Sequence, residues 1–425
     1  MNWDDTNLIF GTGALIIIIF RYIFETGLDF LNTKHVKKHA NAIPHPFEQI
    51  MDETTYRKSI NYTLTKSKFG TLSDTYSTVL LIALLFSGFI AESFMLITNK
   101  LGGDQFAQAT SLWAITWIFQ ALSMPFSWYS QFHIEEKFGF NNSTQKIWWS
   151  DQIKGLVLSF IIGVPLLWFI LWIAETGGNF WWLWVWFIII IFQLLMSIIA
   201  PIFILPIFNK FTPLPDGELK DKLNQLAKKT GFVNSGIQVM DGSRRSAHSN
   251  AFFTGIGKGR KIALFDTLIE QLNKEELEAV LAHEIGHYKL KHVPKMIGWS
   301  FALTLAGLYI LSLLAEPHSG FVEAFGFSSM NYGYGPAFII FLLLSSNVTF
   351  WLTPLSSLWS RKFEYQADEF AANAIGSNVP MITALRKLNR ENLSNLTPHP
   401  VYSGFHYDHP TLIERETALK SEHTM

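Results

Sequence analysis

The 425-residue sequence contains no cysteine. Disulfide bonds, thiolate metal ligands and lipid attachment to a cysteine of this chain are therefore excluded. Charge is scarce and balanced, with 33 basic residues against 34 acidic residues and a formal net charge of −1. Proteins that bind nucleic acids usually carry a strongly basic surface, so we expect no nucleic-acid partner.

Long apolar segments are abundant instead. Seven blocks of about 17–25 residues are long enough to cross a lipid bilayer as helices. The 15 tryptophans and 37 phenylalanines fall mostly in or beside these blocks, as is typical of side chains at membrane interfaces. The predicted spans are Leu8–Phe24, Ser77–Thr98, Phe106–Phe126, Gly155–Ala174, Phe180–Phe203, Met296–Ala315 and Gly335–Leu355.

Basic residues are unequally shared between the connections. Seven lysines and arginines lie between the first two blocks, whereas only Lys100 lies between the second and the third. Cytoplasmic loops carry an excess of these residues, which predicts an N-terminus outside and places the polar segment of about 205–295 and the C-terminus in the cytoplasm. We expect a monomeric multi-pass protein of the inner (plasma) membrane in a bacterium, or of the endoplasmic reticulum membrane in a eukaryote.

The distribution of apolar blocks also divides the chain. The predicted regions are an N-terminal membrane region with five spans (1–204), a polar cytoplasmic domain (205–295), two further spans (296–355) and a cytoplasmic C-terminal region (356–425).

The polar segment after the fifth block has the pattern of a small α+β unit. Leucines at helical spacing predict an amphipathic helix over Asp216–Lys229. Asn273, followed three residues later by Glu276, predicts the capped start of a second helix. Short apolar runs predict strands at Ile237–Met240, Ala251–Thr254 and Lys261–Phe265.

That second helix carries the stretch "LAHEIGHYKLKH", which begins at Leu281. His283 and His287 are four residues apart, so both imidazoles project from one helical face and can bind one metal ion. Glu284 lies one position around the helix, where it can accept a proton from an activated water and pass it to a leaving amine. The alternatives are a chance match or surface histidines, and we expect the nearby His292 to be solvated.

A catalytic zinc site needs a third protein ligand. Leu290 and Val293 stand where the metzincin pattern requires glycine and histidine, so that branch is excluded. The stretch "RKFEYQADEF" instead offers Glu364 and Asp368 on one helical face. Glu364 is suited to bind the metal, and Asp368 to hold the outer nitrogen of a ligand histidine. The alternative is a charged, solvated helix.

Together these motifs resemble the type I CAAX prenyl endopeptidases. The similarity is carried by "VLAHEIGHYKLKH", "SRKFEYQADEF", "HSNAFFTG", "DHPTLIER", "PIFNKFTPLPDGELK" and "IEEKFGFNNST", which occur in matching order over most of the chain. The resemblance implies an all-α membrane bundle of about seven transmembrane helices enclosing a chamber, with a cytoplasmic α+β, gluzincin-like zinc metalloprotease domain. It also implies one Zn²⁺ per chain and removal of the C-terminal tripeptide of isoprenylated proteins or peptides at the lipid bilayer.

The resemblance also assigns roles in the metal site. His283, His287 and Glu364 match the zinc ligands, and Glu284 matches the catalytic base. Asp368 matches the carboxylate that supports a ligand histidine.

Two substrate-contacting groups are implied in the same way. Asn250, Ala251 and Phe252 match an edge strand that pairs with the substrate backbone, a mode of binding that demands few particular side chains. His409 and Arg415 match a catalytic pair that steadies the oxyanion and positions the substrate.

Two other functions are compatible with parts of this pattern. One is membrane-protein quality control by a zinc protease of the HtpX-like kind, which would be expected to be shorter and to have fewer spans. The other is a non-enzymatic membrane receptor or channel with a decayed protease module. The intact Glu284 and the complete ligand set argue against decay.

Overall fold

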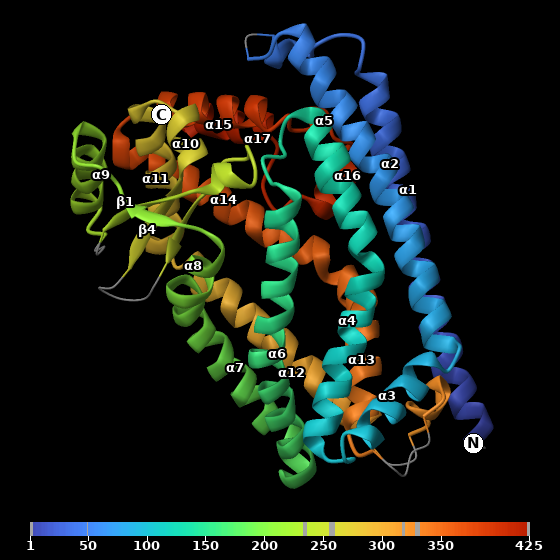
Figure 1. Cartoon of the computed structure of the whole chain (residues 1–425). Helices are drawn as coiled ribbons and strands as arrows, with labels where there is room; N and C mark the ends of the chain where they lie inside the picture. Colours follow the sequence, from blue (N-terminus) through green and yellow to red (C-terminus); the bar gives the residue numbers. More distant parts are fainter. Residues whose placement is uncertain are drawn as a thin grey trace.

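The computed structural model describes residues 3–48, 50–232, 236–254, 260–316, 319–327 and 332–422. Long helices form a bundle with a smaller α+β unit at one end, and the N-terminus lies at the opposite end (Figure 1). The long helices of the bundle are α1 (Trp3–Lys38), α2 (Glu53–Phe86), α4 (Gln105–Tyr129), α6 (Gln145–Thr176), α7 (Trp181–Ile199), α12 (His292–Leu314) and α13 (Gly335–Thr349).

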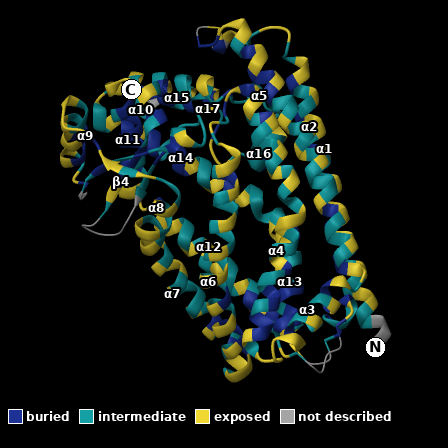
Figure 2. Ribbon diagram, viewed as in Figure 1, coloured by how far each residue is buried: buried dark blue, intermediate teal, exposed yellow. Residues whose placement is uncertain are grey.

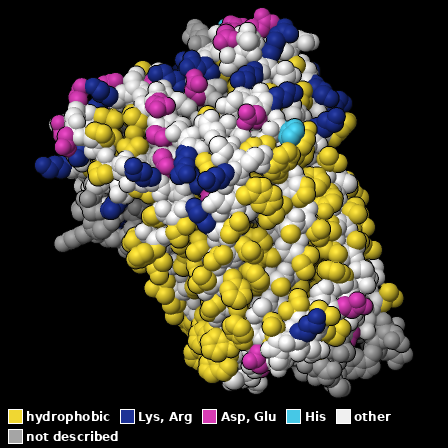
Figure 3. Space-filling model, viewed as in Figure 1, with side chains coloured by type: hydrophobic (Ala, Val, Ile, Leu, Met, Phe, Trp, Pro, Cys, Tyr) yellow, Lys and Arg dark blue, Asp and Glu magenta, His cyan; other side chains and the backbone are white. Residues whose placement is uncertain are grey.

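Six helical segments of the described chain are long and apolar enough to cross a membrane. The third predicted block, Phe106–Phe126, is not among these six; it coincides with α4, which has 25 residues but carries Gln108 and Gln120 among its apolar side chains. Hydrophobic side chains cover the length of the bundle, and charged side chains gather at the end that carries the α+β unit (Figure 3). The predicted fold class, a membrane helix bundle joined to an α+β protease unit, is therefore confirmed.

The second predicted span, Ser77–Thr98, is wrong. Helix α2 ends at Phe86, and Gly88, with φ of 82°, separates it from the short helix α3 (Phe89–Lys100). The membrane-length helix is α2, which begins 24 residues before the predicted span because Glu53 and not Ser77 is its first residue. Its first half carries polar side chains that face an internal cavity, and a search for apolar runs misses such a segment.

This internal cavity has a volume of about 560 Å³ and lies between α1, α2 and the C-terminal region. Arg21, Glu25 and Asp74 line it from the membrane helices, and Tyr407 lines it from the C-terminal region. Arg21 donates a hydrogen bond to Asp74 at 2.8 Å. Charged groups at this depth normally face protein or water, and these groups face the cavity.

The α+β unit contains helix α9 (Glu218–Lys229) and a four-stranded sheet of order β1-β2-β4-β3. Strands β2 and β4 are parallel, and β1 and β3 pair antiparallel at the two edges. The three predicted strands are confirmed, whereas β1 was not predicted because it is very short and contains a proline. The strands are β1 (Phe211–Pro213), β2 (Ile237–Met240), β3 (Ala251–Thr254) and β4 (Lys261–Phe265).

Helix α11 (Lys274–Lys289) lies at the centre of this unit. The predicted capping box is confirmed, because the Asn273 side chain accepts from the backbone N–H of Glu276 and the Glu276 side chain accepts from that of Asn273, both at 2.9 Å. On the next turns Leu281 and Ile285 are fully buried in a core shared with the sheet and α9. Figure 2 shows this buried centre under the sheet and the C-terminal helices.

The C-terminal region closes over α11. Helix α14 continues from the last membrane helix and packs along α11, and the next helices form a layer over it (Figure 1). The helices are α14 (Thr353–Ile375), α15 (Val379–Glu391), α16 (Pro400–His406) and α17 (Leu412–Glu422).

Candidate metal centre

The two predicted motifs meet where α11 and α14 cross. His283 and His287 project from α11 toward Glu364 of α14. Gly286 lies between the histidines, and a Cβ at this position would come within 3.2 Å of the Cα atom of Ala367. The absence of a side chain at Gly286 therefore lets the two backbones approach closely enough for the three groups to converge.

The convergent atoms have the spacing of a metal site. The Nε2 atoms of His283 and His287 are 3.1 Å apart. Glu364 places Oε1 at 3.2 Å from the Nε2 of His287 and Oε2 at 3.4 Å from the Nε2 of His283. Ligand atoms of all three residues lie within 4.8 Å of one another.

One oxygen of Glu364 is a direct sign that a cation fits here. Its Oε2 atom is buried and has no hydrogen-bond partner in the part of the chain that the structure describes. Its nearest polar neighbours, His283 Nε2 and Arg415 Nη1, are each 3.4 Å away and form no hydrogen bond with it, and a metal ion between the imidazoles would satisfy it. Two imidazoles and one carboxylate form the donor set of a catalytic zinc site.

Asp368 lies directly behind the first histidine. His283 donates a hydrogen bond from Nδ1 to Asp368 Oδ1 at 2.8 Å, which leaves Nε2 directed toward Glu364. Burial opposes a charge on this ring, but the hydrogen bonds with Asp368 and Glu364 raise the pKa of His283 to about 9. A ligand histidine must be neutral, so binding of a metal ion displaces a proton.

Glu284 adjoins these groups on α11. Burial raises the pKa of Glu284, while the neighbouring His283 and His287 oppose the rise when they are charged. A carboxylate in such a place can hold a proton during part of a reaction, as a general base and acid must do.

Arg415 lies beneath the ligands as part of α17. Its side chain is 9% exposed. It donates from Nε to Asp368 Oδ2 at 2.7 Å and from Nη2 to Asp368 Oδ1 at 2.6 Å. Its Nη1 atom is 3.4 Å from Glu364 Oε2. The guanidinium therefore neutralises Asp368 and reaches the proposed ligand carboxylate from behind.

His409 approaches the same carboxylate from the open side. Its side chain is 57% exposed, and Nε2 lies 3.4 Å from Glu364 Oε1. His409 donates from Nδ1 to Asp408 at 2.8 Å, and this hydrogen bond raises the pKa of His409. The structure thus brings His409 and Arg415 to one group but places them on opposite sides of it.

Strand β3 is an edge strand, as the sequence predicted. The backbone oxygen of Asn250 accepts from the N–H of Phe265, and Ala251 stands opposite Leu264. In antiparallel pairing this alternation directs the backbone groups of Ala251 and Phe253 away from β4, while Phe252 bonds to β4. The Asn250 side chain accepts from the outward N–H of Ala251 at 2.8 Å. The outer edge of β3 pairs with no strand within the described residues.

The expectation that His292 is solvated is wrong. His292 is 2% exposed and stacks on Phe363, with ring centroids 4.2 Å apart. Its Nδ1 atom is 3.1 Å from His287 Nδ1, and its Nε2 donates to Gln366 at 3.0 Å. His292 therefore supports the second ligand histidine much as Asp368 supports the first. The neighbouring Lys289 and Lys291 suggested a solvated helix end, whereas the burial of His292 depends on its contacts with α14.

Comparisons with known proteins agree with this geometry. Residues 32–210 match the family model described as CAAX prenyl protease N-terminal, five membrane helices, and residues 213–423 match the model of peptidase family M48. A CAAX prenyl protease 1 homolog of Arabidopsis thaliana is 37% identical, over 95% of this chain and 96% of its own length. CAAX prenyl protease 1 of Saccharomyces cerevisiae is 36% identical, over 94% of this chain and 93% of its own length.

A solved structure matches over the whole fold. The crystal structure of S. mikatae Ste24p superposes with a TM-score of 0.91, covers 99% of each chain and shares 33% sequence identity. Both the membrane bundle and the protease unit are included in a match of this extent. From its metal-site geometry and these relatives, the chain belongs to the M48 metallopeptidases, in the family of the type I CAAX prenyl endopeptidases.

Proposed function

We propose that this protein is a zinc-dependent integral-membrane endopeptidase of the CAAX type, which removes the C-terminal tripeptide of isoprenylated proteins or peptides. The observation that carries the proposal is the convergence of His283, His287 and Glu364, with a buried Glu364 oxygen that lacks a donor among the described residues. The names of the relatives that align over nearly the whole chain support the same substrate class.

In this proposal His283, His287 and Glu364 hold one Zn²⁺ ion. When bound, the ion supplies Lewis acidity to the scissile carbonyl and to the attacking water. Asp368 fixes the tautomer and the orientation of the His283 ring, because its carboxylate accepts the Nδ1 proton.

Glu284 is proposed to move the proton. Its carboxylate accepts a proton from the attacking water as the new C–O bond forms, and it returns that proton to the departing amine as the C–N bond breaks. The raised pKa of Glu284, caused by burial, suits a group that must carry the proton between these steps.

The substrate is proposed to add to the open edge of β3. In the segment formed by Asn250, Ala251 and Phe252, the outward backbone groups of Ala251 would pair with the extended peptide and hold the scissile bond without selecting its side chains. His409 would donate to the carbonyl oxygen as negative charge develops on it. Arg415 would act together with it through the buried side of Glu364.

The remaining proposals concern the setting of the site. The excess of lysine and arginine in alternate connections supports a cytoplasmic catalytic site and an N-terminus outside. We propose a monomer. In it, residues 1–204 form the first membrane region, residues 205–295 the protease domain and residues 296–355 the second membrane region, and residues 356–425 complete the site. The membrane is the inner (plasma) membrane in a bacterium or the endoplasmic reticulum in a eukaryote.

The test uses the purified full-length protein and two peptides that differ only in a farnesyl group on the cysteine. We expect one zinc per chain, cleavage after the cysteine, and a higher kcat/KM for the farnesylated peptide. Glu364→Ala should lose zinc under limiting metal, while Glu369→Ala, an exposed residue of the same helix, should keep it.

Other outcomes identify the alternatives. Cleavage of unprenylated membrane proteins without preference for the farnesyl group would favour quality control. Absence of both zinc and cleavage would favour a non-enzymatic protein, and equal zinc content in Glu364→Ala and the wild type would move the third ligand elsewhere.

A further inference from the structure

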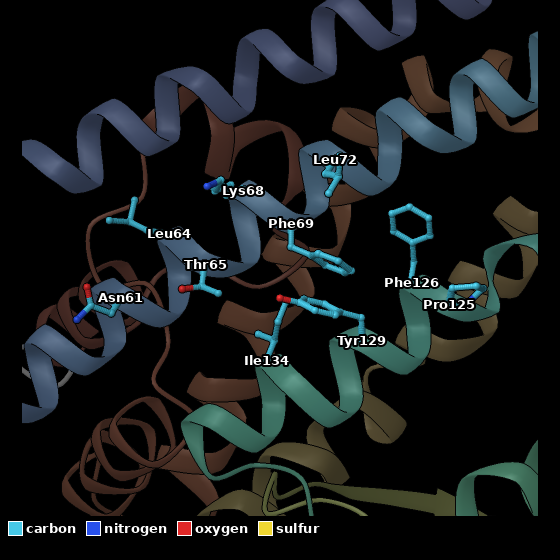
Figure 4. A pocket seen from close by; sticks show the side chains of 10 residues that line it. All are labelled: Asn61, Leu64, Thr65, Lys68, Phe69, Leu72, Pro125, Phe126, Tyr129 and Ile134. Carbon is cyan, nitrogen blue, oxygen red and sulfur yellow. The ribbon is translucent and has the colours of Figure 1, made fainter. Parts of the chain in front are cut away.

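An apolar groove of about 810 Å³ lies between α2 and α4, away from the metal centre. We call it the α2–α4 groove; its apolar lining is Leu64, Phe69, Leu72, Phe126, Tyr129 and Ile134 (Figure 4). It opens on the face of α2 that carries exposed apolar side chains, such as Leu72, which is 59% exposed. Its volume is within the range of about 300–1,000 Å³ that small-molecule pockets occupy.

The groove has one polar end. Asn61, Thr65 and Lys68 line it on the turns of α2 nearer to the protease unit, whereas Leu72, Pro125 and Phe126 line it on deeper turns. A ligand that fits this gradient has a long apolar chain attached to a polar, peptide-like head. The polar residues that face the internal cavity, such as Lys66, lie on another side of α2.

The helix that forms one wall is irregular at the groove. Pro125 interrupts the hydrogen bonds of α4, because proline has no backbone N–H. The next segment, Ser130–Glu135, is π-helical, a distortion that often accompanies functional sites. The hydroxyl of Tyr76 donates to the carbonyl oxygen of Leu122 at 3.1 Å, so α2 and α4 are joined by a hydrogen bond near Pro125. These features give the groove a defined wall.

Aromatic rings join the two walls. Phe69 of α2 stacks on Tyr129 of α4 with ring centroids 5.1 Å apart, and it lies 5.9 Å from Phe126. Phe126 in turn lies 4.6 Å from Tyr76. Figure 4 shows the rings of Phe69 and Tyr129 between the two helices. Such rings offer large rigid apolar surfaces to a chain lying against them.

One end of the groove continues to the predicted substrate strand. Ile134 belongs to a small buried cluster that includes Phe140. Phe140 stacks on His248 with ring centroids 4.2 Å apart, and its carbonyl oxygen accepts from the N–H of Ala247 at 3.1 Å. His248 precedes Asn250 by two residues. The groove and the lead into β3 are therefore linked through the side chains of Phe140 and His248.

We propose that the α2–α4 groove binds the isoprenyl chain of the substrate while the attached peptide pairs with β3. This inference rests on the proposed function, because only a prenylated substrate has such a chain. The continuity from Ile134 through Phe140 to His248 favours the substrate over a bilayer lipid, since it places the groove next to the strand that would hold the prenylated cysteine.

The test fills the groove and measures what the farnesyl group contributes. Leu72→Trp places a bulky ring in the groove, and Val79→Trp is its matched control, because Val79 is on the same helix, is 61% exposed and does not line the groove. The full-length variants are assayed with the farnesylated peptide and with its unprenylated counterpart. Phe126→Ala, which removes a wall, serves as a second variant.

Leu72→Trp should raise KM for the farnesylated peptide about tenfold, because an overfilled site loses contacts with its ligand. Its kcat, its zinc content and its kcat/KM for the unprenylated peptide should stay at wild-type values. Phe126→Ala should show the same selective loss, and Val79→Trp should behave as wild type in every assay. A photoreactive farnesyl analogue on the peptide should label residues of the groove.

Equal preference for the farnesyl group in wild type, Leu72→Trp and Phe126→Ala would overturn the inference while leaving the proposed function intact. Parallel losses with both peptides would also overturn it, because the change would then be structural. Labelling of the groove by a photoreactive phospholipid that the farnesylated peptide does not displace would identify a lipid site instead. A wild-type enzyme without farnesyl preference would refute the proposed function, and this inference with it.

Discussion

Two sides of the Glu364 carboxylate have opposite environments. On the inner side, Arg415 and Asp368 form a buried pair, and the Arg415 side chain is 9% exposed. On the outer side, His409 and Asp408 form a pair whose side chains are 57% and 73% exposed. Arg415 and His409 each come to 3.4 Å from an oxygen of Glu364. We call these pairs the inner layer and the outer layer.

This difference in exposure indicates which of the two side chains, Arg415 or His409, is able to contact a substrate. Two nitrogens of Arg415 are already committed to Asp368, and moving them would leave a buried charge without a partner. His409 has one ring nitrogen bonded to an exposed carboxylate and can turn toward a bound peptide. We therefore propose that the inner layer maintains the shape of the candidate metal site and that the outer layer contacts the reacting atoms.

The largest expected effect follows from substitution of Glu284, the proposed proton carrier, which belongs to neither layer. Glu284→Gln should keep its zinc and lose turnover by about 10²–10⁴-fold, because the amide preserves shape but cannot accept the proton. The measurement is kcat together with metal content in the same sample. Glu275→Gln, on an exposed turn of α11, should retain wild-type turnover. Retention of more than about a tenth of the activity by Glu284→Gln would reject the assigned base.

Removal of the Arg415 guanidinium from the inner layer should mainly lower the stability of the folded protein. Arg415→Ala leaves Asp368 buried and unpaired, which should lower the free energy of unfolding by about 3–5 kcal/mol. The midpoint of thermal unfolding reports the change. Arg386→Ala breaks a more exposed pair with Glu416 and should cost distinctly less. An Arg415→Ala protein of wild-type stability that fails only in turnover would contradict the distinction between the layers.

Removal of the His409 side chain should mainly affect catalysis. His409→Ala should reduce kcat about a hundredfold, since it deletes one donor to the developing oxyanion, while zinc content and the unfolding midpoint stay unchanged. Kinetics and metal analysis on one preparation provide the check. Loss of zinc from this variant would instead make His409 a metal ligand, and wild-type kinetics would make the outer layer dispensable.

The smallest expected effect is on metal affinity. Asp368→Asn keeps the shape and one acceptor oxygen but weakens the support of His283, so zinc affinity should fall about tenfold, at the low end for such partners. Competition with a chelator of known affinity measures it. The same assay on His292→Gln tests the second histidine support, and an unchanged affinity in both variants would show that neither neighbour orients a ligand.

Local periodicity was enough to predict the parts of the site that lie on one helix. His283 and His287 share a face because they are four residues apart, and the same spacing joins Glu364 to Asp368. The capping box at Asn273 and three of the strands are also local patterns, and all of them are present. The three-residue strand β1 carried too few residues to give such a pattern.

Hydropathy was a poorer guide where a membrane helix faces an internal cavity. The predicted second span excluded the first half of α2, because Lys66 and Asp74 read as loop residues when their partners are unknown. The same uncertainty applied to His292, which has charged neighbours in sequence but lies against Phe363 and Gln366 in space. A polar residue looks solvated until the element that buries it is known.

The sequence by itself determined the membrane spans apart from the second and the third, the secondary structure around the catalytic motif and the identities of the candidate ligands, because each follows from spacing along one element. Only the tertiary structure decided that α14 crosses α11 at Gly286, that Arg415 is buried while His409 is open, and that β3 lies at an edge of the sheet. These relations join residues far apart in the chain, and they are set by how closely whole elements pack.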